Sequence, residues 1–337
     1  MDKIAELDPE ALPVMVQGYR LSQALYVVAA LKIPDLLQRG GMIAAELAAA
    51  TGTHPDRLRR VMRALAAEGV FEEDGRGAFS QTRFSAQLVG DSEARLMIMG
   101  WRMLPEAYGA FGALLQAVKT GETAFDHVYA LPFYRYLASH PRAAAVYQAA
   151  MESTVEAFGE ICDAYDFSAA RTIVDVGGGQ GAFLGCLLSR HPDMRGILLD
   201  DPDVVAGSRR RLEAEGIADR VTIVGGDIFL EIPAGADAYF TCTVLRCFDD
   251  YDCVRILKNI RTAMSRDARL VAVEQEVPSG RAQRPTALLD SHSMVVYGGR
   301  DRTATEYGRL FAEAGLELVG VTPVGGPMSA FEGRLSR

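Results

Sequence analysis

The stretch TIVDVGGGQGAF, residues 172–183, decides the fold of this chain. An apolar, strand-like run ends at Asp175 and leads into four glycines, namely Gly177, Gly178, Gly179 and Gly181, before a helix-like segment begins. Glycine lets a backbone turn tightly and approach a ligand that a Cβ atom would exclude. A helix that starts after such a turn offers free N–H groups and the positive end of its dipole. The stretch therefore predicts a strand-to-helix turn that holds a dinucleotide, a phosphate or a nucleoside.

The residues around this turn repeat one pattern. Short apolar runs alternate with helical segments over the second half of the chain, and the runs are 171–179, 195–201, 220–229, 236–245 and 268–277. Alternation of this kind is typical of a parallel sheet covered by helices on both faces. We expect an α/β domain over residues 166–337.

Two more acidic residues follow later runs of this domain. Asp200 ends the second run, about 20 residues after the glycines, where an acid can bind both ribose hydroxyls. Asp227 follows the third run and could reach an adenine amino group, with Phe229 packed on the ring. Each acid alone could be a helix cap. Together they suit a cationic nucleoside better than NAD, because Asp175 would repel a pyrophosphate.

The N-terminal half has a different organisation. Residues 42–68 read as helix, turn and helix, and residues 69–82 read as a hairpin around Asp74 and Gly75, which together predict a winged helix. The basic stretch RLRRVMR (57–63) would suit DNA, but the net charge of −9 argues against non-specific DNA binding, so packing or dimerisation is favoured. Residues 93–165 read as helices rich in Met and Tyr, which serve either a core or the walls of a ligand pocket. The predicted domains are 1–105 (winged-helix dimerisation domain), 106–165 (helical linker and substrate-region helices) and 166–337 (catalytic domain).

Composition bounds the class of protein. The chain has 337 residues, of which 49% are hydrophobic, and its acidic N-terminus lacks the features of a signal peptide. No apolar run approaches the ~20 residues that a membrane span needs. The five cysteines form no CxxC pair, so we expect reduced thiols and a cytoplasmic location, without a membrane or nucleic-acid partner.

Several stretches together resemble one family. VDVGGGQG (174–181), LLDDPDVV (198–205), VLRCFDDYDCVRILKNIRTAM (244–264) and YGGRDRTATEYGRLFAEAGL (297–316) are similar to the S-adenosylmethionine-dependent O-methyltransferases of the acetylserotonin and caffeate O-methyltransferase type. The similarity covers nearly the whole chain. It implies a Rossmann-like class I methyltransferase domain with an N-terminal all-α, winged-helix dimerisation domain, and a homodimer formed through that domain.

The resemblance also implies the ligands and the residues that bind them. S-adenosylmethionine would be the cofactor and S-adenosylhomocysteine its product. The expected cofactor-binding residues are Asp175, Gly177, Gly179, Gly181, Asp200, Asp227, Phe229 and Cys242, with the glycines beside the methionine moiety. The expected substrate-binding residues are Trp101, His127, Met151, Phe158 and Met294.

The chain departs from this family at the catalytic strand. Family members usually have Val-Leu-His-Asp-Trp-Asp-Asp where this chain has VLRCFDD (244–250), so Arg246 takes the place of the histidine that acts as general base. Imidazole titrates near neutrality and can accept the substrate's proton, whereas a guanidinium stays protonated. Cys247 and Phe248 replace the neighbouring Asp and Trp.

Arg246 therefore has two interpretations. It could form a buried ion pair between Glu274 and Asp301, which match the family's supporting acids, or it could bind an anionic substrate group by a forked contact. His292 is a candidate for a relocated base, and the expected catalytic set is Arg246, Glu274, His292 and Asp301. No metal site is expected, because one histidine with Arg and Cys nearby makes no suitable ligand set.

Two functions follow from these residues. The first is a methyltransferase that acts on a small aromatic or polyketide-like secondary metabolite, mainly at oxygen but with nitrogen or carbon as other acceptors. The second is a non-methylating S-adenosylmethionine-dependent enzyme on the same fold, of the hydroxylase, decarboxylase or pericyclase type.

Overall fold

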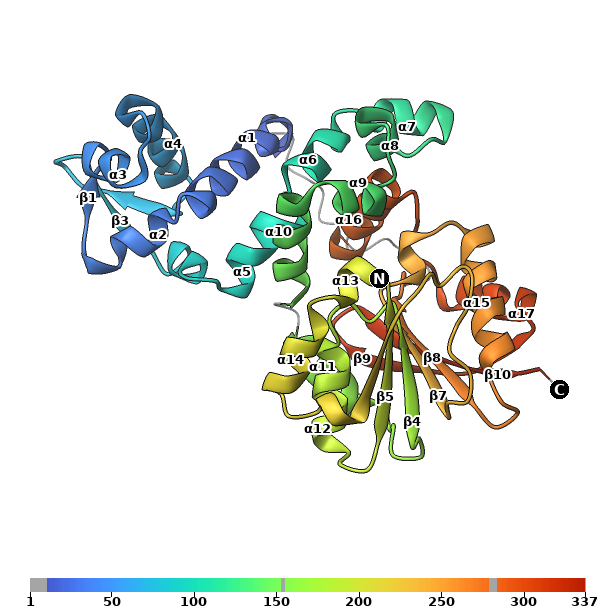
Figure 1. Ribbon diagram of the computed structural model, residues 1–337. Helices are drawn as coiled ribbons and strands as arrows, with labels where there is room; N and C mark the ends of the chain where they lie inside the picture. Colours follow the sequence, from blue (N-terminus) through green and yellow to red (C-terminus); the bar gives the residue numbers. More distant parts are fainter. Residues whose placement is uncertain (1–10, 103, 153–154, 279–283, 337) are drawn as a thin grey trace, which may run out of the picture. The chain divides into compact units, whose positions relative to one another are not determined.

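The computed structural model describes residues 11–102, 104–152, 155–278 and 284–336. The chain divides into two compact units, which are described separately (Figure 1). Unit 1 comprises Met1–Tyr108 and Pro141–Ser153, and unit 2 comprises Gly109–His140 and Thr154–Arg337. The three-part domain limits expected from the sequence stay a prediction.

Unit 1 contains the expected winged helix. Helices α3 (Ala44–Thr51) and α4 (Pro55–Ala67) form the helix-turn-helix, and a small antiparallel sheet has the order β1 (Met42–Ile43), β3 (Ala78–Gln81), β2 (Phe71–Glu73). Asp74 closes the hairpin, since its N–H donates to the carbonyl of Ala78 at 2.9 Å. The remaining elements are α1 (Ala11–Ala30), α2 (Ile33–Leu36), the 3₁₀ turns η1 (Leu37–Arg39) and η2 (Ser85–Leu88), α5 (Glu93–Leu96), the π-helical segment η3 (Met97–Arg102), α6 (Pro105–Phe111), which continues into unit 2, and α10 (Pro141–Glu152).

Unit 2 is built on one sheet whose strand order is β6-β5-β4-β7-β8-β10-β9. Strands β4 to β8 run parallel to one another, and β10 is antiparallel to both β8 and β9. The strands are β4 (Thr172–Val176), β5 (Arg195–Asp200), β6 (Val221–Gly225), β7 (Ala238–Cys242), β8 (Arg269–Gln275), β9 (Leu316–Gly325) and β10 (Met328–Leu335).

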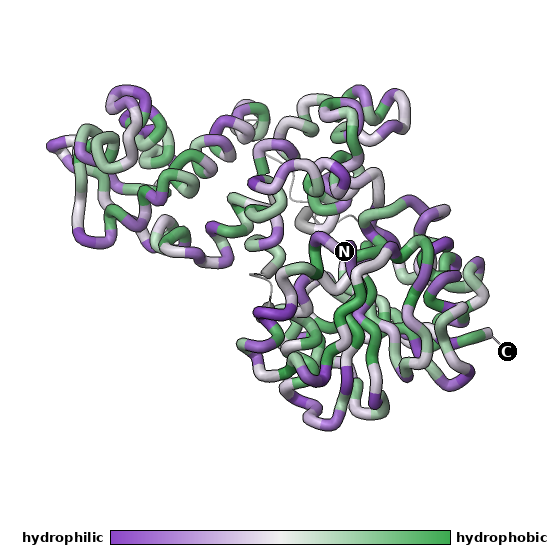
Figure 2. Tube along the Cα trace, viewed as in Figure 1, coloured by the Kyte–Doolittle hydropathy of each residue, from purple (hydrophilic) through white to green (hydrophobic). Residues whose placement is uncertain are grey.

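Helices cover both faces of this sheet, as the alternation of apolar runs predicts. One buried cluster joins α11 (Val155–Ala164), α12 (Ala182–Arg190) and α14 (Ser208–Ala214) to side chains such as Ile173 and Phe240. The other joins α15 (Asp250–Ala263) and α17 (Ala304–Glu313) to Val174 and Tyr239. Figure 2 shows the resulting hydrophobic colour of the central strands. The predicted Rossmann-like fold is therefore confirmed.

The remaining elements of unit 2 are short. They are α7 (Leu114–Thr120), α8 (Ala124–Tyr129), α9 (Phe133–Ser139), α13 (Pro202–Val205), the 3₁₀ turns η4 (Ala218–Arg220) and η5 (Leu245–Cys247), α16 (Arg284–His292) and the π-helical segment η6 (Ser293–Tyr297). In the part of the chain that the structure describes, no helix combines the length and the apolar character required to cross a membrane.

The sheet has a switch point that places a ligand site. Strand β4 pairs with β5 on one side and with β7 on the other, so the chain turns in opposite directions from its central strand. In open α/β sheets, ligands bind beyond the carboxyl ends of the strands at such a point. The turns that follow β4 and β7 therefore lie at the position where a ligand is expected.

Candidate cofactor and acceptor site

The turn after β4 requires its glycines. Gly177, Gly179 and Gly181 have φ values of 72°, 60° and 85°, in the left-handed region that side chains disfavour. A Cβ atom on Gly178 would collide with the carboxylate of Asp175 and would lie 2.6 Å from Leu198 Cδ1. At its glycines, the backbone of residues 177–181, here called the glycine cradle, therefore has no side chain between it and a ligand at the end of the sheet.

This cradle adjoins the turn after β7. A Cβ atom on Gly177 would lie 2.8 Å from Val244 Cγ2, and Val244 stands two positions before Arg246. Asp175 and Phe240 are register partners in the paired strands. Groups on the second turn are therefore close to whatever the first turn holds.

Two acids beside the cradle form no ion pair with any described residue. Asp175 is buried, its Oδ2 accepts no hydrogen bond from any described residue, and burial followed by the charge of Asp200 raises its pKa to about 8. Asp200 Oδ2 accepts a hydrogen bond from the N–H of Gly179 at 2.7 Å, and Oδ1 accepts one from Asp201 at 2.7 Å. Burial raises the pKa of Asp200, although these two N–H groups oppose the shift. A cationic ligand would relieve both desolvated carboxyl groups.

The third acid lies beyond β6. This strand ends at Gly225, so Asp227 follows it by two residues and is exposed. Asp227 Oδ1 accepts a hydrogen bond from the N–H of Phe229 at 2.8 Å. The ring of Phe229 meets Phe248 edge-on at 5.1 Å, and the guanidinium of Arg255 lies 4.9 Å from its centroid. An adenine ring could lie against this aromatic group.

These residues fit S-adenosylmethionine. The cradle is one that a Cβ atom would fill, the buried Asp175 oxygen has no partner among described residues, and the carboxyl groups favour a cation that carries no phosphate. Cys242 ends β7 nearby, and burial, followed by the charges of Glu274 and Asp175, raises the pKa of its thiol. The cysteine therefore offers a neutral side chain to this site.

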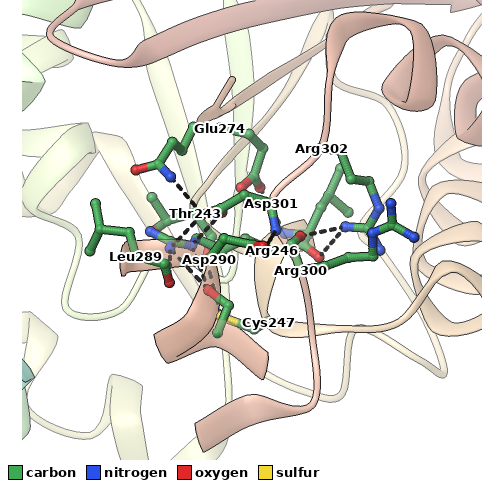
Figure 3. Close-up of polar contacts among 12 residues, drawn as sticks. Thr243, Arg246, Cys247, Glu274, Leu289, Asp290, Arg300, Asp301 and Arg302 are labelled. Atoms are coloured by element: carbon green, nitrogen blue, oxygen red, sulfur yellow. Dashed lines mark hydrogen bonds and ion pairs between the residues drawn. The ribbon is translucent and has the colours of Figure 1, made fainter. Parts of the chain in front are cut away.

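Arg246 lies in the turn η5 and is held by several acceptors (Figure 3). Its Nε and Nη2 donate to Ser293 Oγ at 3.2 and 2.9 Å, and Nη2 also donates to the carbonyl of Leu289 at 3.3 Å and to Asp301 Oδ2 at 3.1 Å. Nε lies 3.0 Å from Asp301 Oδ1, which makes a buried ion pair. The expected pairing with Asp301 is thus present.

Glu274 acts on the backbone of this turn. Its Oε1 accepts a hydrogen bond from the N–H of Leu245 at 2.7 Å, while no ion pair joins its carboxylate to Arg246 within the described residues. The side chain is fully buried, and Oε2 has no hydrogen-bond partner among them. Burial raises the pKa of Glu274 to about 7, against the lowering effects of Leu245 and Arg246. The expectation that Arg246 lies in an ion pair between both acids therefore needs correction, because only Asp301 pairs with the guanidinium.

Asp301 is fixed from three sides. Besides Arg246, Gln275 Nε2 donates to Asp301 Oδ2 at 2.6 Å, and the backbone N–H of Asp301 donates to Asp290 Oδ1 at 2.8 Å. Burial raises the pKa of Asp301 to about 6, and the charge of Arg246 limits the rise. The carboxylate is ionised at neutral pH and offsets part of the charge of Arg246.

One end of the guanidinium stays open. No hydrogen bond of Nη1 occurs with any residue that the structure describes, and Nη1 is not among the fully buried atoms that lack a partner. A forked contact needs two nitrogens, but Nε and Nη2 are already engaged. The predicted forked contact with a substrate anion stays a prediction, and among the described residues only Nη1 has no acceptor.

Aromatic side chains surround this turn within unit 2. The hydroxyl of Tyr134 donates to Cys247 Sγ at 3.2 Å, and its ring stacks on Tyr297 with centroids 5.8 Å apart. His292 is buried and packs on Tyr297 at 5.7 Å and on Phe111 at 6.2 Å. Burial raises the pKa of Cys247 to about 12, so its thiol stays neutral. The environment suits a flat aromatic molecule.

The other expected substrate residues are more scattered. His127 is exposed on α8, Met294 is 38% exposed on η6, and Phe158 packs on Phe183 at 5.9 Å, beside α12. No described contact joins any of the three to Arg246. Met151 belongs to α10 of unit 1, and the side chain of Trp101 lies outside the described residues.

Other residues of the site escaped the sequence analysis. Ser293, Gln275 and Tyr134 contact Arg246, Asp301 and Cys247, yet no local pattern marks them. Ser293 lies directly after His292 in the sequence, but nothing there distinguishes it from other serines. Throughout the described ranges, no group of His, Cys, Asp and Glu could hold a metal ion.

Fold and site together define a class I methyltransferase that uses S-adenosylmethionine. Comparison with known proteins gives the family: residues 111–317 match the model of the O-methyltransferase domain, and residues 15–91 match that of the O-methyltransferase dimerisation domain. The chain belongs to this O-methyltransferase family.

Relatives with known names agree. A phenazine O-methyltransferase of Lysobacter antibioticus is 38% identical, over 95% of this chain and 94% of its own length. A mitomycin biosynthesis 6-O-methyltransferase of Streptomyces lavendulae is 36% identical, over 96% and 93%. The solved structure of a mitomycin 7-O-methyltransferase superposes with a TM-score of 0.93 at 36% identity and covers 97% of both chains. Another, from neocarzinostatin biosynthesis, contains S-adenosylmethionine and a naphthoic acid, with a TM-score of 0.84, 32% identity and coverage of 93% and 95%.

Proposed function

We propose that this enzyme transfers a methyl group to an oxygen of a small aromatic secondary metabolite. One observation carries the proposal: a glycine cradle with two unneutralised carboxyl groups directly adjoins the Arg246 turn and its aromatic neighbours. The names of the relatives, which include phenazine, mitomycin and naphthoate enzymes, support the substrate class. One relative is named as an N,N-dimethyltransferase, so an amine nitrogen is a second candidate acceptor.

The cofactor side of the reaction is proposed as follows. When bound, S-adenosylmethionine supplies an electrophilic methyl group on a sulfonium. Asp200 would accept hydrogen bonds from the ribose, and Asp227 with Phe229 would hold the adenine. Asp175 would lie near positive charge, and Gly177, Gly179 and Gly181 would let the backbone approach the methionine moiety. The Cys242 thiol would border this end.

On the acceptor side, the alignment of the acceptor oxygen takes over the role of the histidine base that other family members use. Aligning an oxygen with the methyl group can supply much of the rate. Glu274 holds the backbone of the turn through the N–H of Leu245, and Asp301 positions Arg246. His292 and Met294 lie on or beside η6, the segment that carries Ser293, and would border the substrate. The roles of Trp101, His127, Met151 and Phe158 stay predictions, as do the cytoplasmic location and the lack of a nucleic-acid partner.

A homodimer is proposed through α1 of the dimerisation domain. Leu12, Met15, Val16 and Tyr19 recur at helical spacing on one face and are 54–66% exposed. An exposed apolar stripe of this kind marks an interaction surface. A second copy of the chain is the occupant that the matched dimerisation domain supports. Met15→Glu should convert dimer to monomer in light scattering, whereas the exposed Glu68→Lys should not, and a monomeric wild type would refute the proposal.

Methyl transfer is tested with labelled S-adenosylmethionine. Purified enzyme is incubated with 1-hydroxyphenazine and with 1,4-dihydroxy-2-naphthoic acid, and the labelled product and S-adenosylhomocysteine are measured. The proposal expects equal amounts of both. If the cofactor binds tightly and a probe is consumed but no S-adenosylhomocysteine forms, the non-methylating alternative is indicated instead. Asp200→Ala should abolish cofactor binding in either case.

A further inference from the structure

We infer that Arg246 binds the methyl-accepting oxygen in its ionised form through Nη1, so that the enzyme acts on acidic phenols and enols. This rests on the proposed function, because it assigns the acceptor within the same site. In this mechanism no side chain removes the proton of the hydroxyl, because the enzyme selects a substrate that is already ionised.

The first step of the argument is the state of the guanidinium. Three of its N–H groups have acceptors in Ser293, Leu289 and Asp301, while Nη1 has none among the described residues, in a side chain that is only 5% exposed. Buried polar groups almost always have a hydrogen-bond partner. Nη1 is not among the fully buried atoms without a partner, so it keeps some access to solvent and can donate to an oxygen of a bound substrate.

The second step is the place of this nitrogen. The Arg246 turn follows β7, and Val244 in the same turn lies against Gly177 of the cradle. An acceptor oxygen has to lie beside the methyl group that the cradle presents. Nη1 is thus an open donor of a residue whose turn borders the cradle.

The third step is the kind of acceptor that one nitrogen can bind. A carboxylate is best bound by two nitrogens in a fork, but Nε and Nη2 are committed to Ser293 and Asp301. A single charged oxygen, as in a phenolate or enolate, needs only one nitrogen. The available geometry thus favours the acceptor oxygen over a remote carboxylate.

The fourth step is charge. Burial alone would lower the pKa of Arg246, but Asp301, Cys247, Glu274 and Tyr297 raise it, so the side chain stays a cation. Guanidinium cannot take a proton from a hydroxyl. Asp301 offsets part of the positive charge, which limits how far Arg246 can favour ionisation. The site is therefore matched to hydroxyl groups that are acidic in their own right.

The reaction then balances without a protein base. The hydroxyl loses its proton to water as the substrate ionises. A lone pair of the oxygen anion forms the new O–CH₃ bond while the C–S bond breaks and its electron pair goes to sulfur. The product is a neutral ether, which loses its ionic contact with Arg246 and can leave.

The test uses 1-naphthol and the more acidic 4-nitro-1-naphthol, two probes of similar size. For the wild type, kcat/KM should rise with pH along the ionisation of each probe, so that the two profiles are displaced from one another. Arg246→Gln should lower kcat/KM about 10²–10³-fold for 1-naphthol, which is the effect of removing one preorganised donor, and less for the nitro compound. Arg246→Lys should recover part of the loss, and the exposed Arg309→Gln is the control for a distant charge.

A second measurement needs neither a variant nor turnover. The visible absorbance of 4-nitro-1-naphthol reports its ionisation, so it is titrated with pH in the complex of enzyme and S-adenosylhomocysteine. The bound probe should ionise at lower pH than the free probe. Identical pH profiles for both probes, or no displacement of the bound titration, would overturn the inference even if methyl transfer occurs. A displaced titration without methyl transfer would preserve it while refuting the proposed function.

Discussion

The turns after β4 and β7 lie side by side at the end of one sheet, yet they are built differently. The β4 turn consists of glycines in left-handed conformations beside carboxyl groups that have no cationic partner among the residues that the structure describes. The β7 turn carries the buried cation Arg246, whose charge is already partly offset by Asp301. The first turn is incomplete until a ligand arrives, whereas the second is nearly complete and leaves one donor open. Under the proposed function, the first turn takes up a cation and the second selects an anion.

The largest expected effect concerns the ion pair of the second turn. Asp301→Asn leaves the charge of Arg246 buried and unpaired, which should cost about 3–5 kcal/mol of unfolding free energy in urea titrations. Adding Arg246→Met should recover much of this loss, because no buried charge then remains. As a control, Asp252→Asn breaks the exposed pair with Arg255 and should cost no more than about 1 kcal/mol. Equal costs for both single variants would mean that the second turn does not depend on its ion pair.

The first turn should fail in a different way. Gly178→Ala forces a methyl group onto Asp175 and Leu198 and should cost about 1–3 kcal/mol of stability, as overpacking does. Gly179→Ala meets no atom of the protein, so its stability cost should be only the ~1–2 kcal/mol of a left-handed residue.

Calorimetry with S-adenosylhomocysteine separates the two variants. Affinity should fall strongly for Gly179→Ala, because the methyl group would occupy ligand space. Gly216→Ala has a similar φ of 70° and open surroundings, so it should match Gly179→Ala in stability and leave affinity unchanged. Equal affinities for these two variants would remove Gly179 from the cradle.

The same contrast explains which parts of the molecule were predictable. The cradle and its acids are local features, since glycine spacing and strand-end acids are visible within a few residues of one another. The winged helix was predictable for the same reason. The partners of Arg246 lie 43–55 residues away, on segments whose approach depends on the fold of the whole unit. Asp301 was found through the family resemblance, but Ser293 carries no distinguishing signal.

Some expected residues illustrate the limit of pattern alone. His127 follows the buried Phe125 on the short helix α8, and the helical period turns it outward. Phe158 has an aromatic partner in Phe183, so its apolar character belongs to the packing between α11 and α12. An aromatic or histidine in a helix can serve a core or a pocket, and only the packed structure distinguishes the two.

A smaller effect tests the charge preference of the first turn. The pKa of Asp175 is raised to about 8 by burial and by Asp200, so its protonated form contributes stability that is full near pH 4 and is lost as the pH rises through 8. A bound cation favours the ionised form and lowers this pKa, which releases a proton. The affinity for S-adenosylmethionine relative to S-adenosylhomocysteine, which lacks the sulfonium charge, should therefore rise between pH 6 and 8.

The slope of this rise is limited to roughly tenfold per pH unit, the value for one proton. Asp175→Asn should remove the difference in slope between the two ligands in isothermal titrations. Asp200 and the neutral Cys242 are the other titratable groups near Asp175, so the Asp200→Asn variant is needed for comparison. A pH-independent ratio of affinities for the wild type would show that the carboxyl groups do not face the sulfonium.

The smallest expected effect lies where the β7 turn meets the segment after β6 through aromatic rings. Phe248 follows the Arg246 turn and meets Phe229 of the cofactor side edge-on at 5.1 Å. Phe248→Leu removes this pair and should cost about 0.5–1.5 kcal/mol, with a several-fold loss of S-adenosylhomocysteine affinity because Phe229 is less firmly held. Phe248→Trp keeps an aromatic edge and should retain affinity. Tyr251→Leu, at an exposed ring nearby, should change neither quantity. If Phe248→Leu lowers kcat but not cofactor affinity, the ring belongs to the acceptor side alone, and the two turns are independent at this contact.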